Sequence, residues 1–300
     1  MSRIKYQRHN STMLVGKKID GIEVAKSVKE CIKIAVEELK AQGIQPCLAT
    51  ILVGDNQASA TYVKNKHNAC SDVGILTKDH KLPSTTTQIE INQLIDSLNN
   101  DPTVHGILVQ LPLPKHLDEF ATTSRISPIK DVDGLTPHNV GLLSVGKAML
   151  KACTPSGIME IFDYYNIGLE GKNVVMINRS NLLGKPLYHM LLEENATVTT
   201  CHSKSKNLKD ICQRADVIIS AVGDRSKFVL TEDMVKDGAV VIDVAISRQD
   251  GKLVGDADFD EIIKKASFVT PVPGGVGPMT VAMLLRNTVI AVSLSKSIGT

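Results

Sequence analysis

Three residues in the first third of the chain, Ser59, Tyr62 and Lys66, fall at positions i, i+3 and i+7 of an expected helix. Side chains with this spacing project from one face of a helix. A lysine one turn from a tyrosine can take part in proton transfer only if some of its population is neutral. Burial in an apolar cleft or contact with a bound cation favours the neutral form. The alternative is a surface lysine whose stem covers the tyrosine ring.

Three other stretches with polar or glycine residues follow apolar runs. Gln110 ends such a run ahead of two prolines, Asp131 and Asp133 share the loop KDVDG, and residues 270–280 read TPVPGGVGPMT. Ligands of open α/β sheets bind at the carboxyl ends of strands. Taken singly, the glutamine is an edge polar group, the first aspartate a turn former and the glycines a tight bend. Taken together with the lysine-bearing helix, they predict one ligand site.

An α/β framework must hold these residues. Residues 49–53 are apolar and lead into Gly-Asp, which predicts a buried strand with the lysine-bearing helix just after it. Helices are also expected at 21–42 and 88–99. Thr154 followed by Pro155 matches an N-cap and first-turn pair of a further helix.

The second half of the chain alternates strands with helices. Five short runs rich in β-branched residues predict the strands: NVVMI, ATVTTCH, DVIISAV, AVVIDVAI and SFVTPV. This order is typical of a parallel, Rossmann-like sheet. We therefore expect two α/β domains, the first at residues 1–150 and the second, a nucleotide-binding domain, at 151–278. A final apolar helix at 279–300 is expected to pack back on the first domain.

The turn after the first of these strands bears on nucleotide binding. In NRSNLLGKP only Gly184 fits the G-x-G-x-x-G spacing, so the motif by itself is weak. We expect Asn178 to take the left-handed conformation that a glycine would otherwise supply. Tyr-x-x-x-Lys is also the catalytic spacing of short-chain dehydrogenases. Those enzymes place it after the glycine-rich turn, and here it comes before, which argues against that class.

The next strand end favours NADP over NAD. NAD sites place a carboxylate about 20 residues past the turn, where it would repel a 2'-phosphate. This chain has CHSKSK at residues 201–206 and no carboxylate there. Arg179 and Ser203 would suit a 2'-phosphate, whereas Lys204 and Lys206 are expected to be solvated loop charges.

Composition excludes several classes of protein. With 43% hydrophobic residues and no biased tract among 300 residues, we expect a soluble globular protein. A net charge of +2 and 3% aromatic residues offer little for phosphate neutralisation or base stacking, so no nucleic-acid partner is expected. No apolar run approaches the roughly 20 residues of a membrane span, so no membrane association is expected.

Cysteine usage and the first residues bear on the compartment. The six cysteines show no C-x-x-C spacing, which predicts reduced thiols and no metal site. The start, MSRIKYQRHNSTM, lacks the apolar stretch of a secretory signal. We expect a cytoplasmic protein, and because the first acidic residue is Asp20, a basic organelle-import peptide stays open as an alternative.

The stretches YVKNK, GILVQLPLP, KDVDGLTPHNVG, CTPSGI, NRSNLLGKP, CHSKS and TPVPGGVGPMTVAMLL together resemble the methylenetetrahydrofolate dehydrogenase/cyclohydrolase family. The resemblance covers about residues 14–295. It implies a homodimer with the folate in a cleft between two α/β domains. It also implies NADP-dependent oxidation of 5,10-methylenetetrahydrofolate to the methenyl form, then hydrolysis of that form to 10-formyltetrahydrofolate.

The resemblance also implies roles for individual residues. Lys66 would be the acid/base residue of the cyclohydrolase, Tyr62 would stack on the substrate, and Gln110 would hydrogen-bond the lysine. Asp133 would hold the pterin ring. The remaining implied site residues are Pro273, Gly274 and Gly275 in the folate cleft, and Asn178, Arg179, Ser180, Gly184, Ser203, Ala245 and Ile246 around the cofactor.

Three departures from the family pattern lie on the cofactor side. Asn178 replaces a glycine, Ala245 and Ser247 alter a Gly-Ile-Asn stretch, and VGDRSKF is one residue longer than usual. If Ala245 blocks the nicotinamide, the protein would be a cyclohydrolase or a folate-binding module with little redox activity. A binding module has no need of a proton-transfer lysine, and this favours the bifunctional enzyme.

Overall fold

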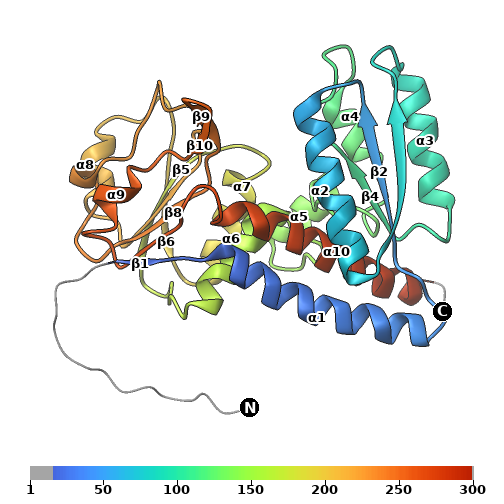
Figure 1. Cartoon of the computed structure of the whole chain (residues 1–300), viewed down its shortest axis with the longest axis horizontal. Helices are drawn as coiled ribbons and strands as arrows, with labels where there is room; N and C mark the ends of the chain where they lie inside the picture. The colour runs from blue at the N-terminus through green and yellow to red at the C-terminus, as the bar shows by residue number, and fades with distance from the viewer. Residues whose placement is uncertain (1–15, 299–300) are drawn as a thin grey trace.

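The computed structural model describes residues 16–298. Two parallel sheets lie toward opposite ends of the molecule, and long helices run between them (Figure 1). The architecture is the predicted one, with two α/β units and a parallel sheet in each.

The first sheet has the strand order β3-β2-β4, and both strand pairs are parallel. Its strands are β2 (Cys47–Val53), β3 (Leu76–Leu82) and β4 (Gly106–Val109), with helices α2 (Gln57–Val73), α3 (Gln88–Asn100), α4 (Glu119–Ser124) and α5 (Pro137–Ser144) in the same half of the chain. Every residue of β2 is buried, as its central position requires. The sequence pattern missed β3 because this edge strand, LTKDHKL, is mostly polar and half exposed.

The second sheet has the order β1-β11-β8-β7-β5-β6, and all of its strand pairs are parallel. Its strands are β1 (Lys17–Lys18), β5 (Asn173–Ile177), β6 (Thr197–Cys201), β7 (Val217–Ser220), β8 (Val240–Asp243) and β11 (Phe268–Val269). Between them lie α7 (Gly184–Glu193), α8 (Leu208–Cys212), the 3-10 helix η1 (Glu232–Met234), α9 (Phe259–Ile262) and the hairpin of β9 (Ser247–Gln249) and β10 (Lys252–Val254). The five β-branched runs thus form strands, as predicted.

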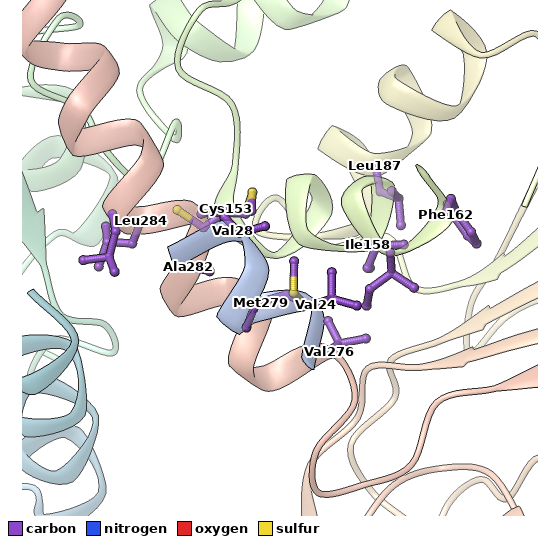
Figure 2. Packing of buried hydrophobic residues seen from close by; sticks show 14 of the residues in the cluster. Val24, Val28, Cys153, Ile158, Phe162, Leu187, Val276, Met279, Ala282 and Leu284 are labelled. Atoms are coloured by element: carbon purple, nitrogen blue, oxygen red, sulfur yellow. The ribbon is translucent and has the colours of Figure 1, made fainter. Parts of the chain in front are cut away.

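Three helices form the layer between the sheets: α1 (Gly21–Ala41), α6 (Cys153–Tyr164) and α10 (Val276–Ile298). Helix α10 packs most extensively against α6 and α1. Figure 2 shows the apolar side chains of these helices in one continuous cluster, with Val24, Ile158 and Met279 among them. A Cβ added to Gly157 of α6 would lie 2.7 Å from Met279 Cβ, so glycine allows the close crossing of α6 and α10.

Local sequence explains where α1 begins and which face it buries. The Asp20 side chain accepts hydrogen bonds from the backbone N–H groups of Ile22 and Glu23, which caps the helix. Residues at four-residue intervals, from Val24 to Val36, are then buried along one stripe. Each such side chain contributes roughly 1.5–3 kcal/mol on full burial, so this stripe holds the helix against the rest of the layer.

Two expectations about α6 and α10 are wrong. Helix α6 starts at Cys153 with Ala152 at the N-cap, so Thr154 lies inside the first turn and its hydroxyl instead bonds Thr280 Oγ1 of α10 at 2.9 Å. The expectation that no apolar run reaches the length of a membrane span fails for residues 276–296 of α10, by length and composition. In the fold 56% of that window is buried, as in a core helix.

The contact of α1 with the loop before α10 gives a stability prediction. A Cβ on Gly21 would lie 1.7 Å from the carbonyl oxygen of Gly275, and that oxygen belongs to rigid backbone. We expect Gly21→Ala to lower the free energy of unfolding by about 1–3 kcal/mol, the range for overpacked sites. Guanidinium titration measures the change. Gly168→Ala is the control, because no atom lies within 4 Å of its added Cβ; equal stability of the two variants would contradict the predicted clash.

Candidate active site

Lys66 and Gln110 meet at the carboxyl end of the first sheet. Helix α2 carries Lys66, and Gln110 directly follows β4. Lys66 Nζ donates a hydrogen bond to Gln110 Oε1 at 3.1 Å. The backbone N–H of Gln110 donates to Ile51 O at 2.9 Å, and its Nε2 donates to Leu111 O at 2.8 Å. These two bonds hold the glutamine so that its acceptor oxygen faces the lysine.

A carboxylate and a thiol complete the surroundings of Lys66. Burial raises the pKa of the Asp133 carboxyl, and the nearby Lys66 charge opposes that rise. Burial also raises the pKa of the Cys153 thiol well above its usual value, and the Asp133 charge adds to the increase. The fold therefore places Lys66, Gln110 and Asp133 together in one polar cluster at the carboxyl end of the first sheet. The thiol of Cys153 beside them is neutral.

Asp131, the other acidic residue of the KDVDG loop, forms the turn. Its carboxylate accepts hydrogen bonds from Leu135 N, Thr136 N and Asn139 Nδ2 at 2.8–3.2 Å. It is 2% exposed and forms an isolated parallel bridge with Ile107 of β4. Asp131 thus orders the loop that presents Asp133, as expected of a turn-forming residue.

Tyr62 lies one turn before Lys66 on α2 and is 49% exposed. Ser59, the third residue of the predicted face, is buried, and its backbone N–H donates to the N-cap side chain of Asn56. The face therefore runs from a buried end to a surface tyrosine. The exposed ring is free to cover a flat ligand at the mouth of the site.

The glycine-rich loop of residues 270–275 joins the layer of central helices. Gly274 has a φ of +98°, which favours glycine, and its carbonyl accepts a hydrogen bond from Gly21 N at 2.9 Å. A Cβ on Gly275 would lie 2.5 Å from Pro271 O. Pro273 is exposed at the tip. The loop is thus held tightly at the start of α10, and within residues 16–298 no hydrogen bond links Pro273, Gly274 or Gly275 to Lys66.

Cavities line the junction of the two halves. One, of about 700 Å³, is lined by Leu111, Phe120 and Leu135 of the first half and by Asn181, Leu182 and Lys185 of the second. This cavity therefore lies between the two halves of the chain, and its lining does not include Lys66, Gln110 or Asp133.

A second cavity, the switch-point pocket, has a volume of about 320 Å³. Its lining includes Asn178, Ser180, Ala221, Gly223, Ala245, Ile246, Thr154 and Thr280. The chain passes from β5 to β6 on one side and later to β7 on the other, so the pocket lies at the point where the strand order reverses. Open α/β sheets bind their ligands at this point.

The prediction for Asn178 is wrong, because its φ is not positive. Its side chain acts instead: Nδ2 donates to Ala221 O at 2.8 Å, while Oδ1 accepts from Ser180 N, Ser180 Oγ and Gly184 N at 2.8–3.1 Å. A Cβ on Gly184 would come within 2.6 Å of Asn178 O. Asn178 therefore links the end of β5 to the end of β7. It also binds Ser180 and Gly184, so the backbone of the turn between β5 and α7 is held by hydrogen bonds within the turn.

Arg179 and Ser203 lie at neighbouring strand ends. Ile177 of β5 pairs with Cys201 of β6, and each of the two polar residues follows two positions later. Both are exposed. This register places a guanidinium and a hydroxyl at the same edge of the sheet, outside the lining of the switch-point pocket.

Sequence reasoning missed two buried carboxylates near this pocket, Asp243 and Asp256. They are 3% and 0% exposed, and the charge of Asp256 acts on Asp243. Burial is the main cause that raises the pKa of Asp243 to about 6. The sequence did contain a signal for one of them, because Asp243 ends the apolar run VVID, and an ionisable residue there is a candidate for a buried site residue.

The raised pKa of Asp243 predicts a pH dependence of stability. In the folded state the carboxyl keeps its proton up to about pH 6, whereas in the unfolded state it loses the proton near its ordinary value of 3.8. The folded state therefore binds more protons in this window, and the contribution to stability falls as pH rises from about 4 to about 6, by roughly 3 kcal/mol. We expect the unfolding free energy of wild type minus that of Asp243→Asn to decrease as pH rises from about 4 to about 6. A difference that stays constant with pH would contradict a raised pKa for Asp243.

Comparison with known proteins agrees with this geometry. Residues 19–133 match the catalytic domain of tetrahydrofolate dehydrogenase/cyclohydrolase, and residues 152–296 match its NAD(P)-binding domain. The bifunctional protein FolD of Nitrosopumilus maritimus is 71% identical over 286 residues, 95% of this chain and 100% of that protein. FolD of Campylobacter concisus is 54% identical over 91% of this chain and 96% of that protein.

Solved structures show the same relationship. The bifunctional FolD of Campylobacter jejuni superimposes with a TM-score of 0.90 at 48% identity, covering 93% of this chain and 99% of that one. FolD of Trypanosoma brucei, solved with NADP and an inhibitor, gives a TM-score of 0.89 at 36% identity over 95% and 99% of the two chains. From the matched domains and the identity to these relatives, the chain belongs to the tetrahydrofolate dehydrogenase/cyclohydrolase family.

Proposed function

We propose that this chain oxidises 5,10-methylenetetrahydrofolate with NADP and hydrolyses the methenyl product to 10-formyltetrahydrofolate in one cleft. Its membership of a bifunctional family supports both activities. The observation that carries the assignment of residues is the hydrogen bond between Lys66 Nζ and Gln110 Oε1 at the carboxyl end of β4, beside Asp133.

For the hydrolytic step, Lys66 is the proton-transfer residue. Gln110 holds the amine in place, and Asp133 binds the polar edge of the pterin ring. The methenyl substrate is a cation, so its arrival beside Lys66 favours release of a proton from the ammonium group. The neutral amine then takes a proton from the water that attacks the methenyl carbon, which gives a carbinolamine. The carbon–N5 bond of this intermediate breaks as the proton on Lys66 passes to N5, the carbinol hydroxyl releases its proton to solvent, and the formyl group stays on N10.

Tyr62 and the loop of Pro273, Gly274 and Gly275 position the substrate. The tyrosine ring is half exposed at the mouth of the site, where it stacks on the folate. The loop is rigid because Gly21 N and the backbone around Pro271 hold it. These groups bind both folate forms and leave the proton transfer of the hydrolytic step to Lys66.

The second domain holds the dinucleotide. The switch-point pocket fits this role, with Asn178, Ser180, Gly184, Ala245 and Ile246 in or beside it. Arg179 and Ser203 at the adjoining strand ends bind the 2'-phosphate, which favours NADP over NAD. NADP, when bound, supplies the hydride acceptor for the oxidation.

A second candidate is a cyclohydrolase with weak redox activity. One observation favours it: Gly184 N, Leu183 N and Lys185 N at the start of α7 all donate to Asn178 or Ser180 within the turn. Those N–H groups are the usual partners of a pyrophosphate. Their occupation would weaken dinucleotide binding without touching Lys66.

We further propose a cytoplasmic homodimer, as the family resemblance implies. The folate chemistry is assigned to residues 1–150 completed by the helix at 279–300, and cofactor binding to 151–278. Helix α10 packs on α1 and α2, which supports its assignment to the folate domain, and it also packs on α6, the helix that begins the cofactor domain. Residues 1–15, which would include an import peptide, lie outside the described residues.

The products made from methylenetetrahydrofolate test the proposal. We expect NADPH and 10-formyltetrahydrofolate when NADP is supplied, and much slower reduction of NAD. Hydrolysis of supplied methenyltetrahydrofolate without reduction of either dinucleotide would favour the second candidate. Absence of both reactions would contradict both.

A further inference from the structure

Two loops form one wall of the switch-point pocket, and both are bonded to buried carboxylates. Residues 221–223 follow β7, and residues 244–246 follow β8. Neither loop belongs to a regular element, so other groups must fix its backbone. Asp256 and Asp243 fix these backbones, although neither residue lines the pocket.

Asp256 holds the loop after β7. It is fully buried, and its Oδ2 accepts hydrogen bonds from Ser220 Oγ at 2.6 Å and Val222 N at 2.7 Å. Its Oδ1 accepts from Gly223 N at 3.0 Å. One carboxylate thus fixes Ser220 at the end of β7 and the amides of Val222 and Gly223.

Asp243 holds the loop after β8. Its Oδ1 accepts from Ala245 N at 3.1 Å, and its Oδ2 accepts from Ala257 N at 2.7 Å. A Cβ on Gly255 would lie 2.0 Å from Asp243 Oδ2, so only glycine allows this approach. The bond to Ala257 ties the loop after β8 to the segment that carries Asp256.

The surroundings of the two carboxylates offer little charge compensation. Arg225 donates through Nη1 to Gly255 O and Ala257 O, which fixes the segment but leaves the carboxylates to backbone and hydroxyl donors. Thr270 contributes a hydroxyl bonded to Asp243 N and Asp243 O. Burial of two neighbouring acids is costly, and core packing alone does not require it.

We infer that Asp243 and Asp256 are positioning residues that set the shape of the dinucleotide pocket by fixing the backbone on both sides of it. The inference rests on the proposed cofactor site and goes further, because neither residue lines the pocket. Both act through the amides of Val222, Gly223 and Ala245. Their effect is confined to the second domain, away from Lys66.

Asp256→Asn tests this role, because the amide keeps the volume and loses one acceptor oxygen. We expect hydrogen exchange of the Val222 and Gly223 amides in the free protein to quicken about tenfold or more, and the Kd for NADP to rise about tenfold. Hydrolysis of supplied methenyltetrahydrofolate should stay within about twofold of wild type. Asp250→Asn, in the exposed turn between β9 and β10, is the control and should change none of these quantities.

Ser220→Ala is a milder variant that removes only one bond to Asp256. If Asp256→Asn fails to fold, this variant should still raise the Kd for NADP while leaving hydrolysis intact. An unchanged Kd in a folded variant, or a parallel loss of hydrolysis, would overturn the positioning role. A wild-type protein that binds no NADP would instead refute the cofactor assignment itself, and this inference with it.

Discussion

Replacement of Lys66 by methionine is expected to lower the rate of methenyltetrahydrofolate hydrolysis by about 10²–10⁴-fold, the usual contribution of a positioned acid/base group. Methionine keeps an unbranched side chain of similar length and removes the amine. The bond to Gln110 Oε1 at 3.1 Å is lost, and the attacking water loses its proton acceptor. Hydrolysis of supplied methenyltetrahydrofolate, followed by its absorbance, measures the effect.

Lys64→Met is the matched control. Lys64 lies on the same helix but is exposed. It should hydrolyse the substrate at the wild-type rate, and both variants should keep their affinity for NADP, because the proposed phosphate ligands lie in the other domain. Full hydrolytic activity in Lys66→Met would contradict the proposed role of Lys66 in proton transfer.

The second large effect is expected at Arg179. The loss of a charge-assisted hydrogen bond costs about 1.5–3 kcal/mol, so Arg179→Ala should raise the KM for NADP by about 10–150-fold. The KM for NAD should change little, because NAD lacks the 2'-phosphate. Ser203→Ala should act in the same direction with a smaller effect. Initial rates of reduction with each dinucleotide measure both constants.

Lys206→Ala is the control for nonspecific electrostatic attraction between a nearby cation and the anionic NADP. Lys206 is an exposed cation on the loop that follows β6, and its removal should alter the KM for NADP by less than about threefold. If Arg179→Ala raises the KM for NADP and the KM for NAD equally, the arginine does not bind the 2'-phosphate.

Much of the fold could be predicted from local patterns. The β-branched runs of the second half became parallel strands, and the apolar stripe from Val24 to Val36 became the buried face of α1. Strand β3 escaped prediction because it is a polar edge strand that is recognisable only beside β2. The prediction that Thr154 caps a helix failed because α6 already begins at Cys153, which places Thr154 inside the first turn.

The site was harder to predict because its contacts join distant segments. Lys66 and Gln110 are 44 residues apart. The strand-end pattern predicted that both belong to one ligand site, but only the family resemblance implied the hydrogen bond that the fold forms between them at 3.1 Å. Ser220 and Asp256 are 36 residues apart, and no motif joined them. Asn178 was expected to act through its backbone, whereas four side-chain hydrogen bonds proved to be its role.

The central claim is that one cleft carries out both steps on one carbon, with Lys66 needed only for the second. The most direct test is the product that Lys66→Met forms from methylenetetrahydrofolate and NADP. The account predicts that NADPH forms and that methenyltetrahydrofolate accumulates in equal amount. Formation of 10-formyltetrahydrofolate at the wild-type rate, or loss of NADPH formation in a folded variant that still binds both ligands, would contradict it.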